Sequence, residues 1–341
     1  MLLPAVIGTA PKLPACGNLD DMTDRWLLID TASLYFRAYF GVPKTVRAPS
    51  VDDDTSGRPI NAAHGLLDML TRLVDSYRPT HLVCAWDEAW RPAWRVALLP
   101  SYKAHRVAQI AADGSPIEMV EAELAAQIPI IDDVLNALGL CVLGAPDAEA
   151  DDVIGTLARA NSAAGIATIV VTGDRDLFQL VDDHTRVAYV ARGVANHELV
   201  DDAWLASKYG IIGAQYADFA TLRGDTSDGL PGVSGVGEKT AASLLAKYGD
   251  LDGILAAAGD DGSELAGGLR HKLLAADDYL RRARLVVKTR DLPGLAIADA
   301  AVASRQPDRA HTELIGTQFG LTGAINRLSD ALEDIQDGAG A

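Results

Sequence analysis

Short apolar runs alternate with amphipathic segments over the first 200 residues of the chain. The runs at 26–29, 81–86, 140–143 and 167–171 are typical of buried strands, and 187–190 favours a fifth. Between them, apolar residues recur at helical spacing over 61–77, 118–138 and 148–160. Strands that alternate with helices in this way predict an α/β fold, in which helices cover both faces of a parallel sheet.

The pattern changes near residue 200, where strands give way to helices and glycine-rich turns. We therefore expect four parts, with a loose leader at 1–24 and an α/β core at 25–200. A helical region follows at 201–310, and a C-terminal segment at 311–341 ends in a frayed acidic tail from Ser329 onward.

Composition excludes several classes of protein. The 341 residues are 49% hydrophobic, which is too apolar for a disordered chain. The cysteines Cys16, Cys84 and Cys141 form no close pair, so a disulfide scaffold and a cysteine zinc site are excluded. The sequence contains no run of 18 apolar residues without a charge, so it predicts no membrane-spanning helix. These features fit a protein of the reducing cytoplasm.

Acidic residues gather at a few positions, although the net charge of −17 by itself argues against an anionic partner. Three predicted strands end in an aspartate, and the carboxyl ends of parallel strands meet at one edge of a sheet. An aspartate there can simply be a turn residue, but several together would repel one another unless cations neutralise them. Oxygen ligands suit Mg²⁺ or Mn²⁺, and two such ions are the arrangement that hydrolyses phosphodiesters. The nine candidate ligands are Asp30, Asp87, Glu149, Asp151, Asp152, Asp174, Asp176, Asp225 and Asp228.

Residues 89–112 contain no acid, so the sign of charge reverses shortly after Asp87. Arginine and lysine can clamp phosphates, and tyrosine and tryptophan can stack on unpaired bases. The alternative is a solvated basic loop whose aromatic residues pack on the core. The basic residues and the aromatic residue of interest are Arg91, Arg95, Lys103, Arg106 and Tyr102.

A glycine-rich turn with Gly232, Gly235 and Gly237 precedes a predicted helix at 238–248. Backbone N–H groups at such a helix start can hold a phosphate, and Lys239 and Thr240 lie in its first turn. The spacing is neither a P-loop nor a Rossmann fingerprint. The alternative is an ordinary corner between two helices. A second basic run over 266–290 either extends this surface or forms a solvated helix face.

Taken together, these motifs resemble the bacterial and phage 5′-nuclease family, relatives of flap endonucleases and of the 5′-nuclease domain of bacterial DNA polymerase I. The resemblance covers roughly 26–290, with the motifs in the family order. Only about 50 residues follow Arg290, so the chain looks like a stand-alone form without a polymerase domain. The motifs are LIDTASLYFRAYF at 28–40, WR…YKAHR at 94–106, EADD at 149–152, TGDRDLFQL at 172–180 and GDTSDGLPGVSGVGEKTA at 224–241.

The resemblance implies a PIN-like nuclease core with a helical arch at about 89–125, followed by a helix-hairpin-helix-type region that grips duplex DNA. It implies that all nine carboxylates bind two or more divalent cations, directly or through water, with Asp174 among the catalytic groups. Lys103, Arg95 and Arg106 are then arch residues that engage the scissile phosphate, and Tyr102 stacks on a base. Potassium at the glycine turn is a further implication.

The expected function is therefore hydrolysis of DNA at 5′ ends and 5′ flaps in replication and repair. Expected substrates are 5′ flaps, 5′ overhangs and nicked or gapped duplex, bound by a monomer in the bacterial cytoplasm near the nucleoid, without a membrane. The sequence leaves two alternatives: a PIN-type ribonuclease, and a non-catalytic structure-specific DNA-binding protein. Minimal PIN enzymes lack the glycine turn and the basic arm, and a non-catalytic relative would lack carboxylates.

Overall fold

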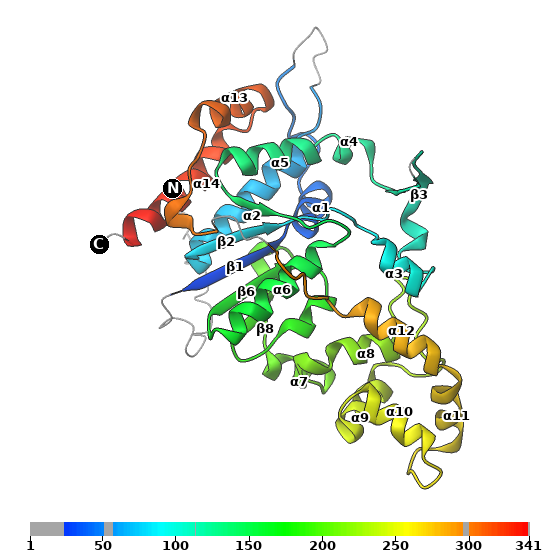
Figure 1. The fold of residues 1–341 in the computed structure, drawn as a ribbon. Helices are drawn as coiled ribbons and strands as arrows, with labels where there is room; N and C mark the ends of the chain where they lie inside the picture. The colour runs from blue at the N-terminus through cyan, green and yellow to red at the C-terminus, as the bar shows by residue number, and fades with distance from the viewer. Residues whose placement is uncertain (1–23, 51–56, 113, 296–299, 340–341) are drawn as a thin grey trace, which may run out of the picture.

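The computed structural model describes residues 24–50, 57–112, 114–295 and 300–339, and its centre is a six-stranded sheet (Figure 1). The strand order is β5-β2-β1-β6-β7-β8. The first five strands in this order run parallel, whereas β8 pairs antiparallel with β7. The strands are β1 (Arg25–Asp30), β2 (His81–Ala85), β5 (Cys141–Leu143), β6 (Ala167–Thr172), β7 (Thr185–Tyr189) and β8 (Glu198–Val200).

Helices cover both faces of the sheet because alternate strand residues point to opposite sides. Leu27 and Ile29 of β1 pack in one core, with α1 (Thr31–Gly41), α2 (Asn61–Tyr77), α5 (Ile128–Ala137) and α14 (Thr322–Ala339). Leu28 faces the other core, which holds α6 (Ala150–Ala163) and α8 (Tyr216–Arg223). This two-faced burial explains why the strands read as unbroken apolar runs.

The predicted α/β pattern is confirmed, with two corrections. The apolar stripe over 118–138 does not form one helix: α4 (Ala122–Ala125) and α5 (Ile128–Ala137) are separate. Pro129 stands in the first turn of α5, where its missing N–H costs nothing, and it cannot continue a preceding helix. The sheet is also not purely parallel, because the short β8 returns along β7.

The segment that should form a helical arch is only partly helical. It contains α3 (Ala93–Leu98), a 3₁₀ turn η1 (Ala104–Arg106), a hairpin of β3 (Val107–Ile110) and β4 (Pro116–Glu118), and the short helix α4. The arch prediction is wrong in this respect. The residues from Val107 onward lack a helical apolar stripe and pair across a turn instead.

A helical region extends away from the sheet, at the lower right of Figure 1. Helix α9 spans the predicted residues, and Gly237 is its N-cap. Gly232 and Gly235 adopt φ of 67° and 79°, so the turn requires the left-handed conformations that glycine allows. The helices are α7 (Asp202–Tyr209), α8 (Tyr216–Arg223), α9 (Glu238–Tyr248), α10 (Leu251–Gly259), α11 (Gly267–Ala275) and α12 (Asp277–Val287).

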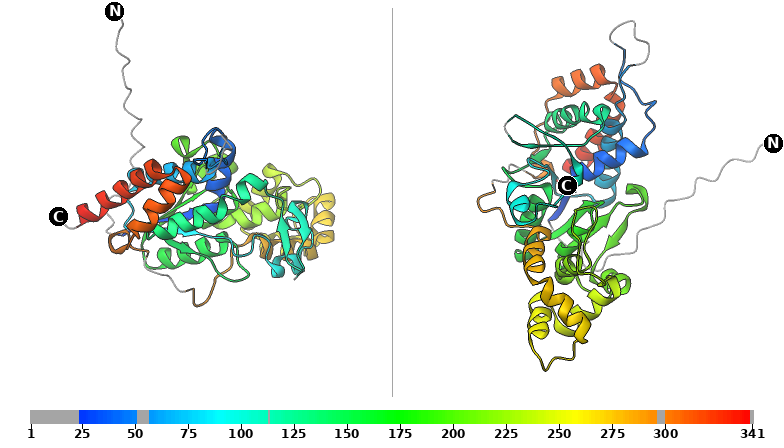
Figure 2. Two further views of the ribbon diagram at one scale, coloured as in Figure 1. Left: turned by 90° about the horizontal axis from the view of Figure 1, so that it is seen from above. Right: turned by 90° about the vertical axis from the view of Figure 1, so that its right-hand side faces the viewer.

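The chain then returns to the core, and its C-terminal helices α13 (Arg309–Phe319) and α14 lie beside the sheet, far from α9–α12 (Figure 2). The expectation of fraying from Ser329 is wrong as far as residue 339, because α14 continues to that point and Leu332 is fully buried in the core that α14 shares with α2. Arg327 of α14 also forms a 2.6 Å ion pair with Asp68 of α2. The predicted leader lies outside the described residues, apart from Asp24. No helix in the described residues is both long and apolar enough to cross a membrane.

Candidate active site

The predicted carboxylates meet at the carboxyl edge of the sheet. Asp30 ends β1, Asp87 follows β2 by two residues, and Asp174 follows β6 by two. β1 lies between β2 and β6, where successive connections leave in opposite directions and open a crevice. A pocket of about 550 Å³ occupies this position. Six of the nine carboxylates line it: Asp30, Asp87, Glu149, Asp151, Asp174 and Asp225.

Backbone contacts fix the orientation of two of these carboxylates. Asp30 caps α1 by accepting the Ser33 N–H at 3.0 Å, and its other oxygen accepts the Thr172 hydroxyl at 2.6 Å. Asp87 accepts the Ala150 N–H at the start of α6, at 2.7 Å. Both aspartates therefore cap a helix as well as facing the pocket, so the capping and the functional interpretations of these residues are compatible.

The remaining three carboxylates, Asp152, Asp176 and Asp228, are buried and do not line the pocket. Asp152 is fully buried and pairs with Arg95, and Asp228 pairs with Arg106 at 3.3 Å. The sequence predicted nine convergent ligands, and the structure brings six of them to one pocket.

Burial and mutual repulsion raise the pKa values of several acids of this cluster. Burial, together with neighbouring Asp87 and Asp174, raises the pKa of Asp30 to about 7. Burial raises the pKa of Asp228 to about 6, and it also raises the pKa values of Asp151 and Asp176 well above their ordinary range. The fold thus keeps these carboxylates close together despite their mutual repulsion, and a bound cation would reduce that repulsion.

The donor set fits hard divalent cations. Every acidic lining group offers oxygen, and the buried Asp176 Oδ1 accepts no hydrogen bond among the described residues. In the same part of the chain, no three acidic, His or Cys side chains form a group ready to hold an ion. Like-charged carboxylates repel one another until a cation lies between them. Loading would then require small rearrangements of these side chains.

Divalent cations should stabilise the folded protein. Adding Mn²⁺ to EDTA-treated protein is expected to raise the Tm by about 5 °C, because an ion that binds only the folded state shifts the unfolding equilibrium. Differential scanning calorimetry of the wild type and of Asp30→Asn would measure this shift. The increase should be smaller in the variant, and an equal increase in both proteins would contradict a role for Asp30 in binding the ion.

Lys103 and Arg106 are the basic residues of the predicted arch that line the pocket. The Lys103 Nζ lies 3.1 Å from Glu149 Oε1, and its backbone adopts a left-handed φ of 47°. That conformation is held by the Lys103 N–H, which donates to Asp228 O at 3.0 Å. Burial alone would lower the pKa of Lys103, but Glu149 and the other acids raise it well above its ordinary value. Lys103 is therefore a fixed cation at the pocket wall.

Three other residues predicted to contact DNA are engaged within the protein. Tyr102 is 3% exposed and its hydroxyl donates to both oxygens of Glu149, at 2.9 and 3.0 Å, so its ring is not free to stack on a base. Arg95 is 2% exposed and pairs with Glu149 and Asp152. Arg91 donates to the carbonyls of Tyr102 and Pro100. Their aromatic and basic character was visible in the sequence, but their burial was not.

The pocket also contains residues that sequence reasoning did not assign to the site. Ser33 lines it, and its hydroxyl accepts the Gly173 N–H at 2.7 Å, which links α1 to the end of β6. Tyr35, Trp90, Glu118 and Arg175 also line the pocket. Ser33 and Tyr35 lie within the motif at 28–40, which was a usable signal, whereas Glu118 comes from the hairpin that the sequence did not predict.

The glycine turn is separate from this pocket. Gly232, Gly235, Gly237, Lys239 and Thr240 do not line it, and Lys239 is exposed. A Cβ on Gly235 would lie 2.8 Å from the Lys272 Nζ of α11, so a second lysine reaches the same turn. The turn and α11 thus offer backbone N–H groups and cations at a second place on the molecule.

Comparison with known proteins agrees with this architecture. The model of the 5′-3′ exonuclease N-terminal resolvase-like domain matches residues 25–210, and that of the 5′-3′ exonuclease C-terminal SAM fold matches 211–310. A 5′-3′ exonuclease of Streptomyces coelicolor is 51% identical over 310 residues, covering 90% of this chain and 99% of that protein. A DNA polymerase I of Mycobacterium bovis is 37% identical over 314 residues, covering 90% of this chain but 32% of the polymerase.

Among solved structures, a bacteriophage T5 flap endonuclease in complex with DNA and metal ions has a similar fold. The TM-score is 0.59 at 16% sequence identity, and the match covers 92% of this chain and 99% of that protein. The two family models together span most of the chain, and the identity to the Streptomyces protein extends over nearly its whole length. The chain belongs to the 5′-3′ exonuclease family, with a resolvase-like, PIN-like domain followed by a SAM-like helical fold.

Proposed function

We propose that this protein hydrolyses DNA phosphodiesters at 5′ ends and 5′ flaps, as a 5′-3′ exonuclease and flap endonuclease of replication and repair. The observation that carries the proposal is the pocket at the sheet edge, where six of the nine predicted carboxylates face one space together with Glu118 and Lys103. Membership of the 5′-3′ exonuclease family supports the same activity.

The six predicted carboxylates that line the pocket are the proposed ligands of two or more divalent cations, Mg²⁺ or Mn²⁺, with Asp174 at the centre of the reaction. Such cations, when bound, activate a water molecule and neutralise charge on the reacting phosphate. Asp176 and Asp228 are buried and do not line the pocket, so they would contribute after side-chain movement or through water.

Lys103 and Arg106 are the proposed phosphate-binding residues. Both line the pocket, and the fixed backbone of Lys103 keeps its ammonium group beside Glu149 before substrate arrives. A cation held in place in this way stabilises charge that develops on the phosphate oxygens without the cost of reorganising it.

The glycine turn is the proposed grip on the duplex. Gly235 and Gly237 leave room for a phosphate to approach the backbone, and Lys239 and Thr240 stand at the start of α9. Gly232 shapes the turn from inside, because its N–H donates to the Tyr279 hydroxyl and its backbone lies against Arg223. Contacts of this kind are made to the DNA backbone, so recognition should depend on DNA structure rather than on sequence. Potassium bound by carbonyls of the turn belongs to this proposal. We also propose that the protein is a monomer and that it acts in the bacterial cytoplasm, in association with the nucleoid.

The experiment that tests this function uses a DNA with a single 5′ flap, labelled at its 5′ end, incubated with Mg²⁺ or Mn²⁺ and with EDTA as control. A metal-dependent product cut near the flap junction is expected, and product length separates flap removal from exonuclease trimming. Faster cleavage of an RNA flap would favour a ribonuclease. Tight binding without cleavage in either metal would favour a non-catalytic DNA-binding protein.

A further inference from the structure

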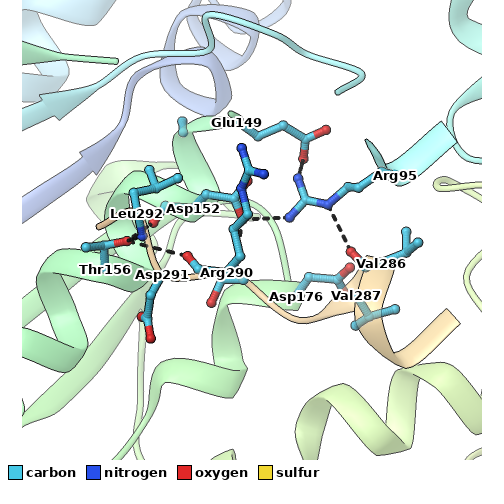
Figure 3. A network of polar contacts seen from close by, with 12 residues as sticks. Arg95, Glu149, Asp152, Thr156, Asp176, Val286, Val287, Arg290, Asp291 and Leu292 are labelled. Atoms are coloured by element: carbon cyan, nitrogen blue, oxygen red, sulfur yellow. Dashed lines mark hydrogen bonds and ion pairs between the residues drawn. The ribbon is translucent and has the colours of Figure 1, made fainter. Parts of the chain in front are cut away.

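Arg95 of α3 uses all three nitrogens of its guanidinium group inside the protein (Figure 3). One terminal nitrogen lies 2.8 Å from Glu149 Oε2 and the other lies 2.8 Å from Asp152 Oδ1. Nε donates to the Val286 carbonyl at the end of α12, at 3.1 Å. The side chain is 2% exposed and does not line the pocket, so no part of it faces a substrate.

Asp152 is enclosed by the same network. Its Oδ1 also accepts the Arg290 N–H at 3.0 Å, and the Arg290 Nε lies 3.9 Å from Oδ2. The Trp94 ring contacts both guanidinium groups, with its centroid 4.7 Å from that of Arg95 and 4.9 Å from that of Arg290. A carboxylate compensated by two arginines and excluded from the pocket serves as an anchor, because its charge is already matched.

Glu149 is the member of the network that does line the pocket. Arg95 pairs with one of its oxygens, Lys103 with the other, and Tyr102 donates to both. A carboxylate held from several sides has one orientation, and second-layer partners of this kind tune how well a ligand group holds a cation.

The network also joins parts of the chain that are far apart in sequence. Arg95 comes from α3 in the basic segment, Glu149 and Asp152 from the start of α6, and Val286 from the last turn of α12. Thr156 of α6 continues the seam by accepting the Leu292 N–H at 3.0 Å. The helix that leaves the helical region is thereby tied to the side chain that orients Glu149.

We propose that Arg95 is a positioning residue that orients Glu149 and ties α12 to the site, with Asp152 as its anchor, rather than a group that binds phosphate. The proposal rests on the function proposed above, because the effect of Arg95 on catalysis is measured as the rate of flap cleavage. It replaces the sequence-based assignment of Arg95 to the phosphate and of Asp152 to the metal ligands.

The test compares Arg95→Met, Arg95→Lys and Asp152→Asn with the wild type. The control is Arg327→Met, which removes an exposed ion pair on α14. Three quantities are measured: Mn²⁺ affinity by electron paramagnetic resonance, flap affinity in Ca²⁺ over a range of salt, and the single-turnover cleavage rate. Arg95→Met should weaken Mn²⁺ binding and slow cleavage by about 10-fold to 100-fold each. Flap affinity and its salt dependence should not change, and Arg95→Lys should recover part of both losses.

Asp152→Asn keeps an acceptor oxygen for Arg95 and for the Arg290 N–H, so it should fold and lose less than about tenfold in rate. A loss as large as that of Asp174→Asn would instead make Asp152 a metal ligand and overturn the proposal. The proposal would also be overturned if Arg95→Met keeps normal Mn²⁺ affinity but the slope of log flap affinity against log salt concentration falls by about one. That change is the signature of a lost phosphate contact. If Arg95→Met does not fold, the decision rests on Asp152→Asn and Arg95→Lys.

Failure of the proposed function would look different. A wild-type protein that cuts no flap but binds Mn²⁺ more tightly than Arg95→Met would remove the nuclease proposal and leave the positioning role intact. If the wild type cuts the flap normally and Arg95→Met has the same Mn²⁺ affinity and cleavage rate, the nuclease proposal stands and the positioning role of Arg95 is removed.

Discussion

Asp174→Asn is expected to slow cleavage of a 5′ flap by about 10³-fold or more, since a metal ligand supplies several kcal/mol of transition-state stabilisation and each 1.36 kcal/mol is tenfold. Asp174 lines the pocket directly after β6, and its Oδ1 accepts the Asp176 N–H at 2.9 Å. Asparagine keeps that acceptor, so the local turn should survive while the charge is lost. The measurement is a single-turnover rate in Mg²⁺ at saturating enzyme.

Flap binding should persist in the same variant. Asp174 is an anion that repels DNA phosphates, so its neutralisation should change flap affinity by less than about threefold or tighten it slightly. Fluorescence anisotropy in Ca²⁺ would measure this. The matched control is Asp183→Asn, an exposed residue just before β7 at the opposite edge of the sheet, which should cleave normally. Near-normal turnover by Asp174→Asn would remove Asp174 from the proposed site.

Lys103→Ala is expected to lower the single-turnover rate by about 10²-fold to 10³-fold, the usual loss when one preorganised charge-stabilising donor is removed. The Lys103 ammonium is one of two pocket-lining cations of the predicted arch, and the backbone N–H bond to Asp228 O fixes its position. Glu149 keeps its contacts with Arg95 and Tyr102 in the variant, so the carboxylate should stay in place.

Affinity for the flap should fall by less than about threefold in Lys103→Ala, because duplex contacts at the glycine turn are untouched. Lys208→Ala serves as control, since this exposed lysine of α7 lies over the Trp204 ring and not at the pocket. An unchanged single-turnover rate for Lys103→Ala would exclude the residue from the reaction. A loss confined to flap affinity would assign it to binding alone.

Local patterns predicted much of the fold. The strands at β1, β2, β5 and β6 and the helices α2 and α9 follow from apolar periodicity and from glycine caps, which act over a few residues. The segment at 107–118 was not predicted, because its strands pair only with each other across a turn. The break between α4 and α5 depended on Pro129 and on the buried Gln127, whose Oε1 accepts the Ala62 N–H at 2.8 Å. That contact joins residues 65 positions apart, and no window along the chain reveals it.

For the site, the sequence by itself determined the chemistry that is available. The aspartates could be assigned to one site from the sequence, because the carboxyl ends of parallel strands meet at one edge of a sheet. The basic segment after Asp87 and the glycine turn before α9 could be recognised from residue types alone. Only the tertiary structure decided which of these groups face the pocket. Asp30, Asp174 and Lys103 line the cavity. Arg95 and Asp152 are buried and pair with each other, and Arg95 donates to the end of α12. The physical reason is that burial and ion pairing depend on which distant segments pack on a side chain, and residue type does not specify those neighbours.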